Sequence, residues 1–389
     1  MNLAFPLATG FAKESRLHSL NAVHDDWLMP VATHLTVAPG GWVQALADIA
    51  DAIAASKGVA APAPGQAHAQ AQAIADSLLG GERKAVLLGN AAAQHPQAGA
   101  LLSLAQWIGE QTGASVGYLG ESANSVGAQL VGAVPGPGGL NASQMLDSAA
   151  ALKACLLLNV EPGLDCADGP AAMAAMHAAE MVVVMSPFKT AAHDVADVLL
   201  PIAPFTETSG TFVNAEGRAQ SFHGVVKPLG DTRPAWKVLR VLANLLELKG
   251  FDFETSEDVR AQALGDLSTI AGRLSNAHAA KIDIAPPSAG LERIADVPIY
   301  ATDATVRRAA SLQLTADARA PQACLPPGLW DQLGLTEGAK VRVSQGAARA
   351  VLPARLDASL AANAVRVPAG HPDTAALGAM FGSITVDRA

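Results

Sequence analysis

The chain has 389 residues, and one domain per roughly 150 residues would give two or three domains. Its 26 basic and 35 acidic side chains give a net charge of −9, and Arg307-Arg308 is about its densest basic pair. A nucleic-acid-binding protein needs a basic face to neutralise phosphates, so this class is excluded. No run of 18 apolar residues is free of charge, which excludes a membrane-spanning helix.

The N-terminus and the cysteines predict a compartment. Residues 1–10 have no basic region and contain Pro6, so we expect no signal peptide there. The three cysteines form no C-x-x-C pair, which is typical of a reducing compartment. Three thiolates are also too few for one iron–sulfur cluster. We therefore expect a cytoplasmic chain with no cluster of its own.

The first part of the chain predicts a helix between two irregular stretches. Residues 1–40 show no regular pattern, and Pro30 and Pro39 interrupt them. Apolar residues at helical spacing predict a helix over 41–57. Residues 58–70 are rich in Ala, Pro and Gly, which indicates a linker.

Strands and helices then alternate. The expected strands are residues 84–88, 115–119, 154–160, 181–185 and 197–200, with helices over 91–111 and 170–180 and a loop over 132–141. This alternation predicts right-handed βαβ units and a parallel sheet, with 154–160 as a buried strand. Ligands of such sheets bind at the carboxyl ends of the strands. Those ends are Gly89-Asn90, Gly120-Glu121, residues 159–162 and Ser186-Pro187.

The C-terminal part predicts helices and then a small β module. Pro234 opens a helix with an expected buried stripe of Trp236, Leu239, Ala243 and Leu246. A second helix is expected over 256–274, followed by a mixed segment to about 325. Residues 340–343, 350–356 and 364–367 alternate with period two, as strands do.

Several searches for catalytic motifs fail. There is no Walker A loop, and the glycine-rich run at 136–141 contains Pro137 and ends in Asn141, so it is a poor dinucleotide loop. Residues 120–124 resemble a nucleophile elbow, but Asn124 stands where the second glycine belongs. The ten histidines show no zinc-binding spacing. Cys166 lies just after a predicted strand and is interpreted as an ordinary small residue rather than a reactive thiol.

The strongest local signal is the run from 196 to 220, a strand and a proline followed by a loop of hydroxyls, amides and glycines. Its backbone N–H groups and Arg218 could cradle an anionic ligand. Alternatively it is a packed loop in which Glu207 pairs with Arg218 and Asn214 caps a turn. The residues alone favour neither interpretation.

This run resembles the molybdopterin oxidoreductase superfamily. The matching positions are residues 196–201, Glu207, Gly210, Thr211, Asn214, Glu216, Gly217, Arg218 and Gln220. More closely, the chain resembles the family formed by the large peripheral subunit of NADH-quinone oxidoreductase, which is respiratory complex I. Residues 25–29, 86–99, 123–128, 156–162 and 222–242 carry that resemblance.

The resemblance implies an α/β fold: a molybdopterin-oxidoreductase-like parallel α/β sheet domain with a small C-terminal β-barrel-like module. The implied boundaries are a partial α/β segment over 1–57, a linker over 58–70, the α/β domain over 71–275, a connecting segment over 276–325 and the β module over 326–389. The chain looks like the C-terminal part of that large peripheral subunit, because the cysteine-rich N-terminal domains of the family are not present in it.

The implied role is structural support for electron transfer from NADH to quinone, coupled to ion translocation, without catalysis by this chain. The resemblance implies no catalytic residue, no metal ligand and no cofactor here, since the family's iron–sulfur clusters lie in the N-terminal part and molybdopterin is not expected. It implies other peripheral-arm subunits of complex I as partners, and a cytoplasmic location attached to the inner membrane through the complex. The positions that would correspond to a lost cofactor site are Gly89, Asn90, Asn124, Asn159, Glu161, Thr211, Asn214 and Arg218.

Two other functions stay open. One is a cofactor-binding molybdopterin oxidoreductase subunit acting on a small substrate such as formate or nitrate. The other is an unrelated α/β binding protein or transferase.

Overall fold

The computed structural model describes residues 15–147, 152–190, 193–286 and 289–389. The expectation about a signal peptide at 1–10 lies outside these residues. The chain divides into two units. Unit 1 is Met1–Leu119, Asn276–Pro298 and Arg319–Ala389, and unit 2 is Gly120–Ser275 and Ile299–Ala318.

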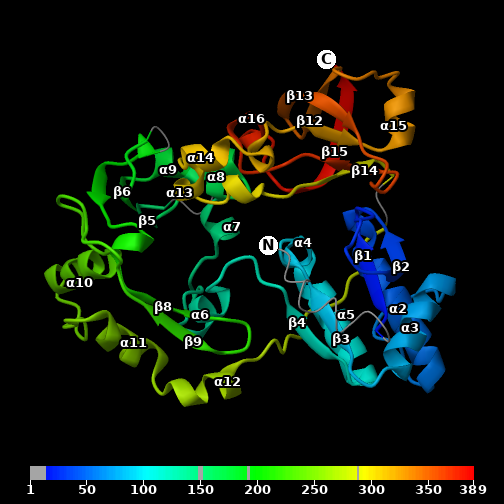
Figure 1. The fold of residues 1–389 in the computed structure, drawn as a ribbon, viewed down its shortest axis with the longest axis horizontal. Coiled ribbons are helices and arrows are strands. Elements are labelled where there is room, and N and C mark those ends of the chain that lie inside the picture. Colours follow the sequence, from blue (N-terminus) through cyan, green and yellow to red (C-terminus); the bar gives the residue numbers. More distant parts are fainter. Residues whose placement is uncertain (1–14, 148–151, 191–192, 287–288) are drawn as a thin grey trace. The chain divides into compact units, whose positions relative to one another are not determined.

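The first half of unit 1 packs three long helices and one short helix with two small parallel sheets (Figure 1). Its elements are β1 (Leu17–Asn21), β2 (Val31–Thr36), α2 (Trp42–Lys57), α3 (Ala69–Gly80), β3 (Ala85–Leu88), α4 (Asn90–Ala93), α5 (Ala98–Thr112) and β4 (Ser115–Tyr118). Strand β1 pairs with β2, and β3 pairs with β4. The small side chains of α2 let it pack closely on α3 and α5, and these helices supply most of the core.

The rest of unit 1 contains a closed barrel in the order β10-β14-β11-β13-β12-β15. Its strands are β10 (Leu291–Ile294), β11 (Ala323–Leu325), β12 (Lys340–Gln345), β13 (Ala348–Leu356), β14 (Ala364–Arg366) and β15 (Phe381–Arg388). Alternate residues of β12 and β13 point into an aliphatic core. The predicted barrel-like module is confirmed, although β10 and β11 come from the segment that was expected only to connect.

Unit 2 is built on the parallel sheet β5-β6-β7. Its strands and longer helices are β5 (Ala154–Leu158), α9 (Gly169–Ala178), β6 (Met181–Ser186), β7 (Val198–Pro201), β8 (Gly210–Val213), β9 (Ala219–Phe222), α10 (Ala235–Leu245) and α11 (Ser256–Leu264). Its short helices are α6 (Ser125–Leu130), α7 (Ala142–Met145), α8 (Pro162–Asp165), α12 (Ile270–Arg273), α13 (Ala304–Arg307) and α14 (Ala310–Gln313). Short 3-10 turns complete both units (Pro39–Gly41, Phe205–Glu207, Leu267–Thr269, Ile299–Ala301, Ala316–Ala318), with short helices α15 (Pro327–Gln332) and α16 (Pro372–Ala375) beside the barrel.

The α/β class and the positions of five predicted strands are confirmed, but several details of the expectation were wrong. Residues 15–40 contain the pair β1–β2, and a helix, α3, follows the linker. The expected helix 91–111 is broken into α4 and α5 because Pro96 has no N–H to donate. The expected helix 256–274 ends at Gly265, whose φ of 65° is a left-handed conformation that favours glycine. The five predicted strands form two parallel sheets, β3-β4 and β5-β6-β7, rather than one.

Burial also differs from the prediction in unit 2. One face of β5 is exposed, so this strand is not buried as expected. In the stripe predicted for α10 only Ala243 is buried, and Leu246 is exposed. Among the described residues, no helix is long and apolar enough to cross a membrane.

Candidate functional site

The carboxyl end of the sheet β5-β6-β7 carries a buried carboxylate, Glu161. The chain leaves β5 through Asn159, whose φ of 55° is left-handed and whose N–H donates to the carbonyl of Met185 at 2.9 Å. This turn ends the pairing of β5 with β6 just before Glu161 and α8. The side chain of Glu161 is only 1% exposed, whereas Asn159 itself is exposed.

Two arginines from a distant part of the sequence bind this carboxylate. Arg307 donates from Nη1 to Oε2 of Glu161, and Arg308 donates from Nη2 to Oε1 and from Nη1 to Oε2, the last at 3.2 Å. The hydroxyl of Thr190 donates to Oε1 at 3.1 Å. Both oxygens of Glu161 are therefore fully engaged by the protein.

The same two arginines are held from the other side as well. Figure 1 shows their segment, α13 and α14, beside α8. Arg307 donates to Asp165 of α8 and to the carbonyl of Ala301. The guanidinium of Arg308 lies 5.0 Å from the centre of the Phe188 ring, a cation–π contact. Two cations and two anions thus form a neutral cluster at the strand ends.

The charges of this cluster decide the protonation of Glu161. Burial by itself would raise the pKa of its carboxyl. The hydrogen bonds and charges of Arg308 and Arg307 outweigh that effect and hold the pKa below its usual value. Glu161 is therefore an anion at neutral pH, and an unfavourable neighbour for an anionic ligand.

The run that carried the strongest sequence signal forms the hairpin β8–β9. The Oδ1 atom of Asn214 accepts the N–H groups of Glu216 and Arg218, at 3.1 and 2.9 Å, and Gly217 has a φ of 80°. Asn214 therefore caps a turn, as the structural alternative predicted. The expected pair of Glu207 and Arg218 does not form, because Glu207 accepts the N–H of Leu229 at 2.9 Å instead. Arg218 is exposed.

The other predicted positions in unit 2 also have structural partners. The Oδ1 atom of Asn124 accepts the N–H of Val213 at 2.9 Å, which ties the start of α6 to β8. The hydroxyl of Thr211 lies 2.9 Å from that of Ser221 across the hairpin. The amide and hydroxyl groups that could have held a ligand are thus used by the protein.

Gly89 and Asn90 lie in unit 1, at the carboxyl end of β3. Gly89 precedes α4, and both residues are exposed. A few residues on, His95 is buried between the rings of Trp42 and Phe381. Its Nδ1 accepts the N–H of Gln97, so its Nε2 carries the proton and faces the carbonyl of Pro39 at 3.1 Å. This region is packed for structure.

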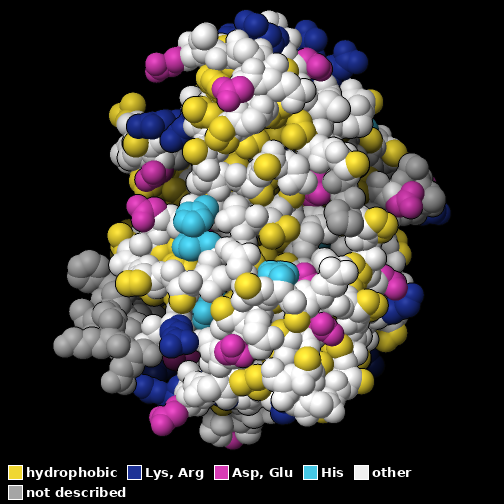
Figure 2. Space-filling view, turned by 90° about the vertical axis from the view of Figure 1, so that its right-hand side faces the viewer, with side chains coloured by type: hydrophobic (Ala, Val, Ile, Leu, Met, Phe, Trp, Pro, Cys, Tyr) yellow, Lys and Arg dark blue, Asp and Glu magenta, His cyan; other side chains and the backbone are white. Residues whose placement is uncertain are grey.

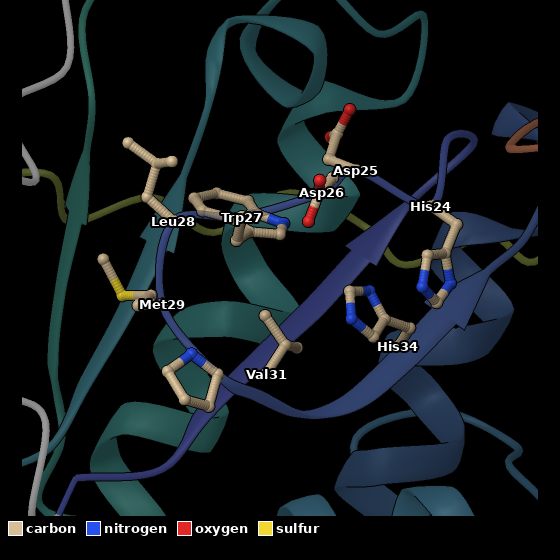
Figure 3. A pocket seen from close by; sticks show the side chains of 9 residues that line it. His24, Asp25, Asp26, Trp27, Leu28, Met29, Val31 and His34 are labelled. Carbon is tan, nitrogen blue, oxygen red and sulfur yellow. The ribbon is translucent and has the colours of Figure 1, made fainter.

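A hollow of about 600 Å³ lies in unit 1, on the connection between β1 and β2. Figure 3 shows the rings of His24 and His34 facing each other, and their centres are 3.8 Å apart. Trp27 and Leu28 continue the lining. Figure 2 shows histidines gathered on one face of the molecule among charges of both signs. Within the described ranges, no group of three or more His, Cys, Asp or Glu side chains is arranged to hold a metal ion.

The cysteine after β5, Cys166, lies where its thiolate form is disfavoured. Cys166 is half-buried and not in a disulfide. Burial, with the charges of Asp165 and Asp168, raises the pKa of its thiol, so the thiolate needed for metal binding is disfavoured. This agrees with the interpretation of Cys166 as an ordinary residue.

Sequence reasoning found Asn159 and Glu161 but missed the groups that surround them. Arg307 and Arg308 were noted only as a dense basic pair, and Thr190 and Asp165 were not considered. The arginines are 146 and 147 residues from Glu161 in sequence, so no local pattern joins them. Only the adjacency of two arginines was visible as a signal.

The family model described as "Molybdopterin oxidoreductase" matches residues 34–245, more than half of the chain. Proteins named "Putative formate dehydrogenase" from Staphylococcus aureus strains USA300 and N315 are 41% identical over 80 residues, which is 21% of this chain and 8% of theirs. Acetylene hydratase from Pelobacter acetylenicus aligns with a TM-score of 0.44 and 16% identity, over 62% of this chain and 42% of that one. The similarity thus covers only a small part of the length of the staphylococcal relatives.

Proposed function

The chain belongs to the molybdopterin oxidoreductase family, and we propose that within it this chain is a non-catalytic, structural portion of a larger electron-transfer assembly. Its place would be in the large peripheral subunit of NADH-quinone oxidoreductase, supporting electron transfer from NADH to quinone. Its partners would be the other peripheral-arm subunits, and the redox centres would belong to the rest of the assembly.

The observation that carries this proposal is a partly exposed apolar face of the parallel sheet in unit 2, on which Met185 is buried but several neighbouring side chains of the described residues are not. On one face, Cys155 and Leu157 pack with α9 through Met176. On the other face large apolar side chains are between 41 and 49% exposed, namely Leu156, Leu158, Met181 and Val198. Parallel sheets are stable with both faces covered. A subunit surface that packs onto this face would complete the usual arrangement.

A second apolar surface supports the same proposal. Val225 and Leu229 are 83 and 78% exposed. Their loop is not loose, because the N–H of Val225 donates to the carbonyl of Thr206 at 2.7 Å and the N–H of Leu229 is bound by Glu207. Rigid, exposed apolar groups of this kind mark protein interaction sites.

The residues at the strand ends do not fit the family's molybdenum–pterin cofactor. Such a cofactor carries anionic phosphate groups, whereas Glu161 presents a carboxylate and, together with Asp165, neutralises the two arginines beside it. Asn124 and Asn214 have their amide oxygens engaged by backbone N–H groups. We therefore propose no chemical step on this chain.

A cofactor-binding subunit is the second candidate. It is favoured by the names of the staphylococcal relatives, whose similarity covers 80 residues. Its substrate would be a small molecule of the formate type. The two candidates differ in what the purified chain contains.

The test uses the chain expressed together with its neighbouring iron–sulfur subunits and recovered through a tag. Molybdenum, oxidised-pterin fluorescence and iron are measured per chain in the same folded sample. Leu158→Asp, on the partly exposed sheet face, is compared with Leu314→Asp, a control at a residue that is 88% exposed in the same unit.

We expect near-zero molybdenum and pterin, with iron recovered through the partner subunits. Leu158→Asp should lower the recovered iron by about tenfold or more, because a buried, unpaired charge costs several kcal/mol at an interface. Leu314→Asp should leave it unchanged. Pterin and molybdenum near one per chain would replace the structural proposal with the second candidate, and full iron recovery with Leu158→Asp would contradict the docking face.

A further inference from the structure

We infer that Arg307 and Arg308 form an oxyanion-binding site at the carboxyl end of β5 and β6, which the chain keeps closed with the carboxylate of its own Glu161. The ligand class is a phosphate or pyrophosphate group. This inference rests on the proposed non-catalytic function and explains how an anionic ligand would be excluded.

The geometry is that of an anion site with its anion in place. Two guanidinium groups and the hydroxyl of Thr190 converge on one pair of oxygens. The planar fork of an arginine matches a carboxylate and a phosphate equally well. The side chain of Arg307 is only 11% exposed, so its charge is little screened by water, whereas that of Arg308 is 30% exposed.

The arginines are held in place by groups other than Glu161. Arg307 donates from Nε to the carbonyl of Ala301 at 3.0 Å, and Arg308 donates from Nη1 to the carbonyl of Ala304 at 2.9 Å. Arg308 also lies over Phe188. Removing the carboxylate would therefore leave the donors in position, as a binding site requires.

The charge balance then favours an anion. With Glu161 the cluster sums to zero: two arginines against Glu161 and Asp165. Without Glu161 one positive charge is left over, beside the buried position of the lost carboxylate. A free anion cannot compete in the wild type, because the tethered carboxylate acts at a high effective concentration and is itself almost fully buried.

The test measures binding of inorganic pyrophosphate, orthophosphate and ADP by titration calorimetry and by thermal shift, with sodium chloride at matched ionic strength. The proteins are the wild type, Glu161→Ala, and Glu161→Ala combined with Arg307→Met and Arg308→Met. The control is Glu207→Ala, which removes a carboxylate of the same unit that binds a backbone N–H rather than guanidiniums.

We expect Glu161→Ala to bind pyrophosphate about tenfold or more tightly than the wild type does. The triple variant and Glu207→Ala should show no gain. Tighter binding of pyrophosphate than of ADP identifies a site for the free ion, and the reverse identifies one for a nucleotide phosphate; either supports the inference. Equal, weak binding by all variants would overturn it.

Glu161→Gln guards against misfolding of the alanine variant. It keeps the volume and removes the charge, so pyrophosphate should stabilise it more than matched sodium chloride does. If neither variant responds to pyrophosphate, the inference is wrong. That failure would not touch the proposed function, which depends on the molybdenum, pterin and iron content of the wild type.

Discussion

Arg293 in the barrel and the pair Arg307–Arg308 at the strand ends all donate to oxygens of the protein, but those oxygens differ in charge. Arg293 is 0% exposed, and among the described residues its hydrogen-bond acceptors are oxygens without formal charge. These are the amide oxygen of Gln345 and the carbonyls of Val367, Pro368, Gly378 and Ala379. Arg307 and Arg308 instead bind carboxylates directly.

The different acceptors indicate different roles: Arg293 holds the barrel together, and Arg307 and Arg308 bind an anionic group. The carbonyls around Arg293 belong to the loops between β14 and β15, so one side chain ties several barrel segments together. Burial without a countercharge lowers its pKa to about 10. At the strand ends the partner of Arg307 and Arg308 is the carboxylate of Glu161, which takes the place that an anionic ligand would take. Removing that carboxylate would leave an anion-binding site, whereas removing the partners of Arg293 would disrupt the barrel.

The largest expected effect follows from replacing Arg293 with methionine. The substitution removes the donors of several buried oxygens, and each unsatisfied buried group costs about 1–3 kcal/mol. We expect Arg293→Met to lower the free energy of unfolding of unit 1 by more than about 3 kcal/mol. Urea unfolding with amide hydrogen exchange in the barrel strands measures this.

The control for Arg293→Met is Arg342→Met, at an exposed arginine on β12 of the same barrel. It should change the free energy by no more than about 0.5 kcal/mol. Equal losses in both variants would show that the carbonyl cradle contributes nothing beyond ordinary surface packing.

A smaller expected effect is on the pH dependence of stability, to which Glu161 contributes and Arg293 does not. The pKa of Glu161 lies below its usual 4.5 in the folded chain, so between the two values the unfolded state binds more protons. The stability of unit 2 is therefore retained above about pH 4.5 and falls as the pH drops through the folded pKa. Arg293 is protonated in both states over this range and contributes no slope.

Unfolding midpoints between about pH 3 and 7 test this difference. Glu161→Gln should flatten the acid slope of unit 2, because the amide does not titrate. Arg293→Met should leave the acid slope of unit 2 unchanged while lowering the free energy of unfolding of unit 1 at every pH. An unchanged slope in Glu161→Gln would assign the acid sensitivity to other carboxylates.

The sequence predicts local elements of this fold well and their assembly poorly. Apolar runs between glycines and prolines locate β3 to β7 within about two residues, because such runs depend only on neighbouring residues. The barrel strands β10 and β11 escape detection because they have four and three residues and pair with partners far along the chain. The separation of β3-β4 from β5-β6-β7 into two sheets likewise depends on contacts between residues far apart in the sequence.

The candidate site shows the same limit. The position of Glu161 follows from the rule that parallel strands present ligands at their carboxyl ends. What occupies that end depends on Arg307 and Arg308, which return to it from a segment between two barrel strands. The turn-capping role of Asn214 could be predicted because its partner lies within four residues. The partner of Glu207, Leu229, could not be predicted because it lies 22 residues away.

The smallest expected effect concerns another arginine of the barrel, Arg366. It tests whether burial or pairing with a carboxylate determines how much stability is lost when an arginine is replaced. Arg366 on β14 donates to Asp357 at 2.7 Å, and their side chains are 32 and 13% exposed. Such partly solvated pairs contribute about 1 kcal/mol or less. We expect Arg366→Met to cost that much in low salt and less in about 0.5 M sodium chloride, since salt screens exposed charges. The loss in Arg293→Met should not depend on salt. If Arg366→Met destabilised the barrel as much as Arg293→Met does, pairing with a carboxylate rather than the number of buried acceptors would govern the cost.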